Sequence, residues 1–210
     1  MKRAMINLLL QYLAVAIVAA GLGFESAHGQ PAAPAADNAA KFRDLHGEWR
    51  RAGAGFACVV GPATKLAPEA VTPEILSRAC LHMGPLMVGD SAQMLKNTLG
   101  APHKTLPQPN GGTALIYFIE TADHYPYFVV TVAKDRIIAL QVTGPAAAKG
   151  YTYNHIDLGV PADTLVQFFG QPTHFEPSEE KGTELWTYNP WPFSFEVRDG
   201  HVSSIRIHEP

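Results

Sequence analysis

The chain contains little cysteine and, after its N-terminal segment, no long apolar run. Only two cysteines occur among its 210 residues. A membrane-spanning helix needs about 20 mostly apolar residues, and no stretch after the N-terminal segment meets that requirement. We therefore expect a protein that is not membrane-spanning once a signal segment has been removed.

Basic residues are also scarce, above all near the C-terminus. The whole chain has 16 Lys+Arg against 19 Asp+Glu, while residues 151–210 have three against nine. Nucleic-acid binding requires a basic face, so this composition excludes nucleic acid as a partner. A basic partner or a cation remains compatible with it, although surface carboxylates commonly serve solubility.

Motifs for catalysis are missing as well. The sequence has no G-x-S-x-G, no S-x-x-K and no Cys-His-Asn pattern in a recognisable context. Four histidines near Glu176, Glu179 and Glu180 suggest a metal site, but none of them forms an H-x-H or H-x3-H pair; they are His155, His174, His201 and His208. We expect no enzyme activity, no cofactor and no metal.

The N-terminus has the order of a secretory signal. Lys2 and Arg3 precede an apolar run, and the small residues Ala27 and Gly29 suit cleavage before Gln30. We assign residues 1–29 to a signal peptide and residues 30–38 to a Pro/Ala linker, with an uncleaved anchor as the alternative. The expected location is the periplasm or the exterior.

Export also bears on the two cysteines, Cys58 and Cys80. In an oxidising compartment an even pair most simply forms a disulfide, and a catalytic thiol is the rival interpretation. Residues 39–85 are expected to be a helical segment containing this bond. One helix is predicted from Asp37 or Asn38 to about Arg51, and another from Thr72 to about His82.

A short pattern occurs twice, 70 residues apart, at 88–102 (VGDSAQMLKNTLGAP) and 158–172 (LGVPADTLVQFFGQP). Missing such a repeat would misread the fold. In each copy the second Gly suits a helix C-cap, and the Pro after it prevents continuation. The matched positions are Gly89, Leu95, Leu99, Gly100 and Pro102 with Gly159, Leu165, Phe169, Gly170 and Pro172.

Each copy begins a unit of one helix followed by three strands. We assign repeat 1 to residues 86–150 and repeat 2 to residues 151–210. Asp199-Gly200 is a strong two-residue hairpin signal. The predicted strands are 113–120, 127–133, 136–143, 184–189, 193–198 and 201–208, with a possible extra strand at 151–158. The predicted class is α+β, with both units forming one larger curved sheet and helices packed on one face.

The strand faces differ between the units. Strand 193–198 alternates apolar and polar residues, which predicts one buried and one wet face. Strand 127–133 is largely apolar on both faces. We expect the second face of that sheet to be covered by the N-terminal segment or by a partner.

These features resemble a known family. A Gly, a short helix, Leu-Gly-x-Pro, a Tyr-bearing strand and a hairpin are similar to SmpA/OmlA-type modules, and two in tandem after an early disulfide resemble β-lactamase inhibitory proteins. The residues are those matched above, together with Tyr117, Lys134-Asp135, Trp186, Tyr188 and 199–202. The resemblance implies an exported, non-enzymatic module that binds other proteins. It transfers no functional residue.

Two aromatic loops are the candidate partner-binding sites, because Tyr and Trp dominate interface hot spots. The residues are Tyr125, Tyr127, Trp191 and Phe193. The alternative is a hydrophobic plug that covers the end of the sheet. Our leading interpretation is an envelope scaffold or accessory subunit, possible in outer-membrane assembly. An inhibitor of a secreted or periplasmic hydrolase and a carrier of a small ligand or cation are the alternatives.

Overall fold

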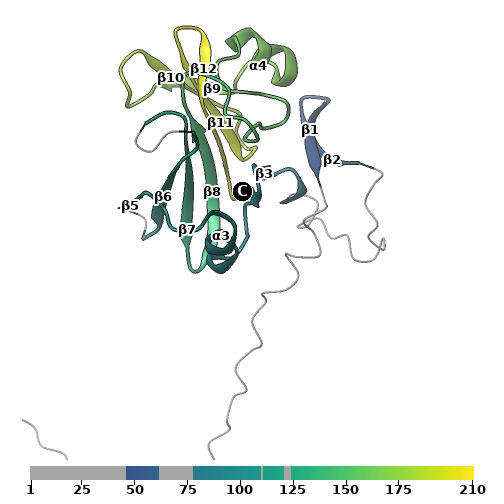
Figure 1. The fold of residues 1–210 in the computed structure, drawn as a ribbon. Coiled ribbons are helices and arrows are strands. Elements are labelled where there is room, and N and C mark those ends of the chain that lie inside the picture. The colour runs from purple at the N-terminus through teal and green to yellow at the C-terminus, as the bar shows by residue number, and fades with distance from the viewer. Residues whose placement is uncertain (1–45, 62–77, 110, 121–123) are drawn as a thin grey trace, which may run out of the picture. The chain divides into compact units, whose positions relative to one another are not determined.

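The computed structural model describes residues 46–61, 78–109, 111–120 and 124–210 (Figure 1). The chain divides into two units, residues 1–34 and 35–210, and every described residue belongs to the second. The described residues form two helices, one large antiparallel sheet and two small two-stranded sheets. Strands dominate, which agrees with the predicted α+β class.

The large sheet contains the strands of both predicted repeats. Its eight strands lie in the order β5-β6-β7-β8-β12-β11-β10-β9, so β8 and β12 pair in the middle and the short strands β5 and β9 lie at the edges. The first half comprises α3 (Ala92–Leu99), β5 (Lys104–Pro107), β6 (Thr113–Phe118), β7 (Tyr127–Ala133) and β8 (Arg136–Thr143). The second comprises α4 (Ala162–Phe169), β9 (His174–Pro177), β10 (Thr183–Thr187), β11 (Phe193–Arg198) and β12 (His201–His208).

The two halves use the same hydrogen bonds at matched positions. The first glycine of each motif donates its N–H to the last hairpin of its own half: Gly89 to Ile137 O at 2.8 Å, and Gly159 to Val202 O at 2.7 Å. Both glycines have positive φ, +96° and +80°, which favours glycine. The closing glycine of each helix accepts from a tyrosine hydroxyl, Gly100 O from Tyr117 at 3.5 Å and Gly170 O from Tyr188 at 3.1 Å.

The helices begin differently although they end alike. Ser91 caps α3, because its Oγ accepts from the N–H of Met94 at 3.1 Å. The corresponding residue before α4 is Pro161, which offers no side-chain cap. Leu95 of α3 and Leu165 of α4 are buried in the core.

The core lies against one face of the large sheet, which we call the inner face. Residues of this face alternate with outward-pointing neighbours along each central strand. Both helices and the loop before α4 contribute to the same hydrophobic cluster. Its fully buried large side chains are Leu81, Met83, Leu86, Leu95, Phe128, Ile137, Leu140, Ile156, Tyr188, Phe193 and Phe195.

The segment before repeat 1 departs from the prediction. The predicted helix ending near Arg51 is wrong over its described part, because β1 (Gly47–Ala52) and β2 (Gly55–Val60) form an antiparallel hairpin. Pairing with β2 decides the conformation, and Gly53 at φ +61° makes the turn. Most of the second predicted helix, 72–82, lies outside the described residues. In its described end, residues 78 and 79 have helical backbone, whereas His82 already belongs to β3 (His82–Met83), which pairs with β4 (Leu86–Met87).

Each strand of the hairpin is joined to the rest of the fold. The predicted disulfide is confirmed, linking Cys58 of β2 to Cys80 with their Cα atoms 5.8 Å apart. On the other strand, the Asn154 side chain accepts from Trp49 N–H at 2.7 Å and donates to Trp49 O at 3.0 Å. The extra strand predicted over 151–158 is wrong, because Asn154 and His155 have positive φ and make a turn there.

Candidate functional site

The candidate site is the face of the large sheet opposite the core, which we call the outer face. Two rows of directly paired residues cross all of its central strands. The first row is Phe118, Tyr127, Thr143, Ser204, Glu196, Leu185 and Glu176. The second is Lys104, Ile116, Val129, Gln141, Arg206, Ser194, Thr187 and His174.

The rows change character from one half of the sheet to the other. In β6 and β7 they are aromatic and aliphatic, with the Lys104 ammonium 5.3 Å from the centroid of the Phe118 ring. Ile116, Phe118 and Val129 are half-buried and do not belong to the core cluster. In β9, β10 and β11 the first row carries two carboxylates on either side of Leu185, and the second row is polar, with Ser194, Thr187 and His174. Cover of the outer face of β7 by the N-terminal segment or by a partner stays a prediction.

A hydrogen-bonded polar network occupies the middle of the outer face. The Thr143 and Ser204 hydroxyls lie 3.0 Å apart, and both side chains are buried although they point away from the core. The amide of Gln141 donates to Ser204 at 3.0 Å and to Thr143 at 3.2 Å, while its oxygen accepts from Arg206 at 3.1 Å. Mutual bonds of this kind hold the side chains in one arrangement.

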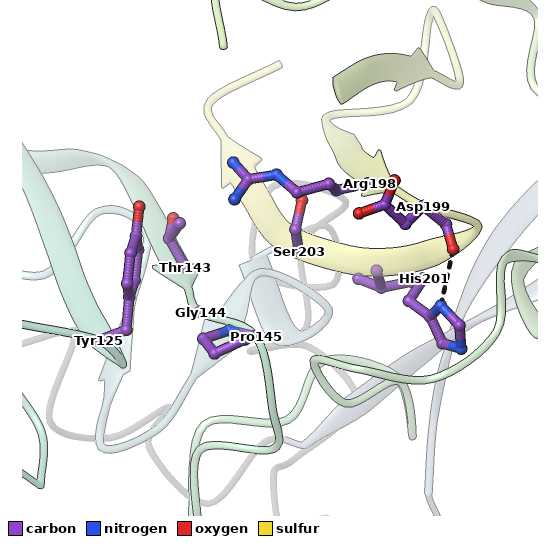
Figure 2. A pocket seen from close by; sticks show the side chains of 9 residues that line it. Tyr125, Thr143, Gly144, Pro145, Arg198, Asp199, His201 and Ser203 are labelled. Atoms are coloured by element: carbon purple, nitrogen blue, oxygen red, sulfur yellow. Dashed lines mark hydrogen bonds between the residues drawn. The ribbon is translucent and has the colours of Figure 1, made fainter. Parts of the chain in front are cut away.

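At one end of the network lies a pocket of about 440 Å³, which we call the tyrosine pocket (Figure 2). Figure 2 shows Tyr125 on one side and Arg198 with Ser203 on the other. Tyr125 stacks on Tyr127, with ring centroids 5.2 Å apart and an interplanar angle of 22°. The lining residues are Tyr125, Thr143, Gly144, Pro145, Arg198, Asp199, His201, Val202 and Ser203.

A second pocket of about 350 Å³, which we call the glutamate pocket, adjoins the first. Thr143 lines the tyrosine pocket and its bonded neighbour Ser204 lines the glutamate pocket, so the two hollows meet at this hydroxyl pair. The lining residues are Gln141, Glu176, Pro177, Ser178, Glu179, Leu185, Ser194, Phe195, Glu196, Ser204 and Arg206.

Burial alters the acid–base behaviour of two groups at the site. Desolvation raises the pKa of Tyr127, and its hydrogen bond with Thr143 opposes that rise. Desolvation lowers the pKa of Arg206, and the nearby Glu196 opposes that effect. Arg206 remains a cation at physiological pH because guanidinium pKa values start so high.

The four sequence-predicted aromatic residues fall in different environments. Tyr125 is 40% exposed and lies with Tyr127 at the edge of the outer face. Trp191 is half-buried, and its ring packs edge-on against Phe56 with centroids 4.8 Å apart. Phe193 is only 1% exposed and belongs to the core. Its assignment to a partner surface is corrected, because a side chain so deeply buried cannot meet a partner.

The polar network and the glutamate pocket were not predicted from the sequence. Gln141 and Ser204 are 63 residues apart and meet only because β8 pairs with β12. Two signals were available: the alternation in β11, which correctly assigned Ser194 and Glu196 to the face away from the core, and the acidic residues Glu176 and Glu179, which the sequence suggested for a metal site and which line this pocket.

Within the described residues, no group of three or more His, Cys, Asp and Glu side chains is placed to hold a metal ion. His155 lies 2.8 Å from Glu48 and His174 lies 3.5 Å from Glu176, in separate places. As for the membrane, the described ranges contain no helix with the length and apolarity needed to span it.

The chain matches no family model and no curated protein. Solved structures with some likeness include a cysteine-rich secretory protein from Staphylococcus aureus (15% identity, TM-score 0.40, 58% of this chain and 42% of that one). Another is a DUF4309 family protein from Bacillus subtilis (13% identity, TM-score 0.41, 58% and 79%). A third, from Streptococcus mutans, is provisionally assigned as a beta-lactamase inhibitor (14% identity, TM-score 0.22, 55% and 80%). These values assign neither a family nor a function to the chain.

Proposed function

We propose that this protein is an exported, non-enzymatic module that binds another protein through the outer face of its large sheet. The observation that carries the proposal is the outer face itself, with two adjoining pockets on either side of a hydrogen-bonded polar network. Rigid polar groups beside exposed aromatic rings are typical of protein-binding surfaces.

Export is part of the proposal and is supported by two features. The N-terminal residues have the charge and apolar order of a secretory signal. A disulfide joins Cys58 to Cys80, and such bonds are typical of oxidising compartments. We expect the mature protein in the periplasm or outside the cell.

The absence of enzyme activity is likewise proposed. Two of the hydroxyls that line the pockets, those of Thr143 and Ser204, are bonded to each other and to Gln141. No histidine is hydrogen-bonded to either hydroxyl in the described part of the chain, so neither has the base that an activated nucleophile requires.

We also propose that the two halves are tandem copies of an SmpA/OmlA-like unit. The support is the matching pair of glycine hydrogen bonds, the matching tyrosine bonds to the helix-closing glycines, and a strand order that is mirrored about β8 and β12.

The test is affinity capture from envelope and secreted fractions with the wild-type protein and two variants. Gln141→Arg puts a bulky charge at the centre of the outer face, next to Arg206. Gln167→Arg makes the same change on the exposed surface of α4. We expect stoichiometric recovery of one protein by the wild type and by Gln167→Arg, and its loss with Gln141→Arg.

Thermal melting of all three proteins excludes misfolding as the cause of that loss. Equal recovery by Gln141→Arg would show that the outer face is not the binding surface. Failure of the wild type to retain any protein would overturn the function itself.

A further inference from the structure

The charges lining the glutamate pocket are unbalanced. Three carboxylates, Glu176, Glu179 and Glu196, face one guanidinium, Arg206. Among the described residues no ion pair joins Arg206 to any of these carboxylates, and its guanidinium donates instead to Gln141. Glu176 has the His174 imidazole 3.5 Å away, whereas Glu179 and Glu196 have no ion-pair partner among the described residues.

The floor between the carboxylates is apolar. Leu185 pairs with Glu176 on one side and with Glu196 on the other, so its side chain separates the two carboxylates on the outer face. Pro177 adds further apolar surface. An apolar floor bounded by carboxylates fits a side chain with an aliphatic stem and a cationic end.

One of the carboxylates is held in position from within the protein. The Ser178 hydroxyl donates to Glu196 Oε1 at 2.7 Å, which fixes the carboxylate at the rim of the pocket. A carboxylate held in this way loses little side-chain freedom when a cation binds it.

A hydroxyl that lines the same pocket makes no bond within the protein. Ser194 is only 8% exposed and points outward between the core residues Phe193 and Phe195. Within the described ranges its Oγ makes no hydrogen bond. Because Ser194 lines the pocket, its Oγ is placed to accept from a donor that enters.

We propose that the glutamate pocket accepts an arginine or lysine side chain of the partner protein. The inference rests on the proposed function, because it names the chemistry of the partner at the same surface. Carboxylates at the rim would meet the cationic head, Ser194 would accept one of its N–H groups, and Leu185 would contact the stem.

The test measures the chemistry of the pocket without needing the partner. The full-length mature protein is titrated with N-acetyl-arginine-methylamide and, separately, with the matching citrulline compound, which has nearly the same shape and no charge. Binding is followed by the NMR amide shifts of Ser178, Ser194 and Glu196. We expect the arginine compound to shift these signals and to bind at least about fivefold more tightly than citrulline.

Matched variants locate the binding. Glu176→Gln with Glu196→Gln should weaken the arginine compound by about three- to tenfold, since each partly exposed pair contributes little. Asp163→Asn removes the same kind of charge from the exposed first turn of α4, and it should leave binding unchanged.

Two results would overturn the inference: equal binding of arginine and citrulline, or equal weakening by the pocket and α4 variants. Neither would affect the proposed function, which is judged by capture with Gln141→Arg. Loss of capture with Gln141→Arg together with no preference for arginine would mean that the surface binds a partner of different chemistry.

Discussion

Trp191 shows how one side chain ties the second half of the sheet to the N-terminal hairpin. Its indole packs edge-on against Phe56 of β2, with ring planes at 84°. The backbone of Gly55, at the start of β2, also lies against the indole, because a Cβ added there would be only 2.5 Å from the ring. This packing fits the hydrophobic plug that was the alternative to a partner-binding role, and the choice between the two stays a prediction.

Truncating this side chain should destabilise the fold. We expect Trp191→Ala to lower the free energy of unfolding by about 2–3 kcal/mol, less than for a fully buried tryptophan because the ring is only half-buried. Urea denaturation measures the change. Tyr125→Ala is the control and should cost less than about 1 kcal/mol, since Tyr125 is exposed. An unchanged stability of Trp191→Ala, with loss of partner capture, would restore the hot-spot hypothesis.

At the scale of elements, the two helices can be compared with each other, because they differ in the residue before their first turn. They have the same length and the same closing glycine, yet only α3 has a side-chain cap at its start. The stability of α3 should therefore depend on Ser91, whose oxygen accepts from the N–H of Met94. The stability of α4 should not depend in the same way on Pro161.

Ser91→Ala should therefore lower the free energy of unfolding by about 1 kcal/mol, the usual cost of losing a helix cap. Pro161→Ala, at the matching position before α4, removes no cap bond and should change stability much less. Thermal or chemical unfolding of both variants checks the comparison. Equal effects at the two positions would show that the Ser91 bond contributes nothing.

Element prediction from the sequence succeeded where local signals and pairing agree. The hairpin at Asp199-Gly200 was predicted, and both residues have the positive φ that such turns require. Strands β5 and β9 were missed because all four residues of each are exposed and show no alternation. The helix predicted up to Arg51 failed because its helical spacing depended on few apolar residues, and pairing with β2 decided the conformation instead.

The candidate site was predictable only in part for a similar reason. Aromatic loops can be recognised in a sequence, and they located Tyr125 and Tyr127 at the rim of the outer face. The polar network depends on the register of β8 against β12, which joins residues more than 60 positions apart. No local pattern encodes that register.

At the scale of the whole molecule, buried tyrosines in both halves make the stability of the fold depend on pH in the alkaline range. Desolvation raises the pKa values of Tyr117, Tyr153 and Tyr188 above their ordinary value. A phenol whose pKa is higher in the folded state contributes stability that is fully present below the unfolded value, about 10. That stability is lost as the pH rises from there through the folded values.

We therefore expect stability to be insensitive to these groups at neutral pH and to fall above about pH 10. Tyrosinate absorbance and far-ultraviolet circular dichroism, recorded together against pH, check the prediction. Ionisation of the buried tyrosines and unfolding should occur in one transition. Full ionisation of the tyrosines near pH 10, while the circular dichroism stays native, would contradict it.

The edge strands β5 and β9 have a further consequence at this scale. Along an edge strand, every second residue directs its backbone N–H and C=O toward the neighbouring strand, and the residues between direct theirs to solvent. The Gln108 N–H bonds to Gly112 O and the Ser178 N–H bonds to Thr183 O, so the preceding residues, Pro107 and Pro177, are among those that face solvent. Proline has no N–H to offer an incoming strand. Each edge of the sheet thus offers an incoming strand one hydrogen-bond donor fewer, which disfavours edge-to-edge pairing of two sheets.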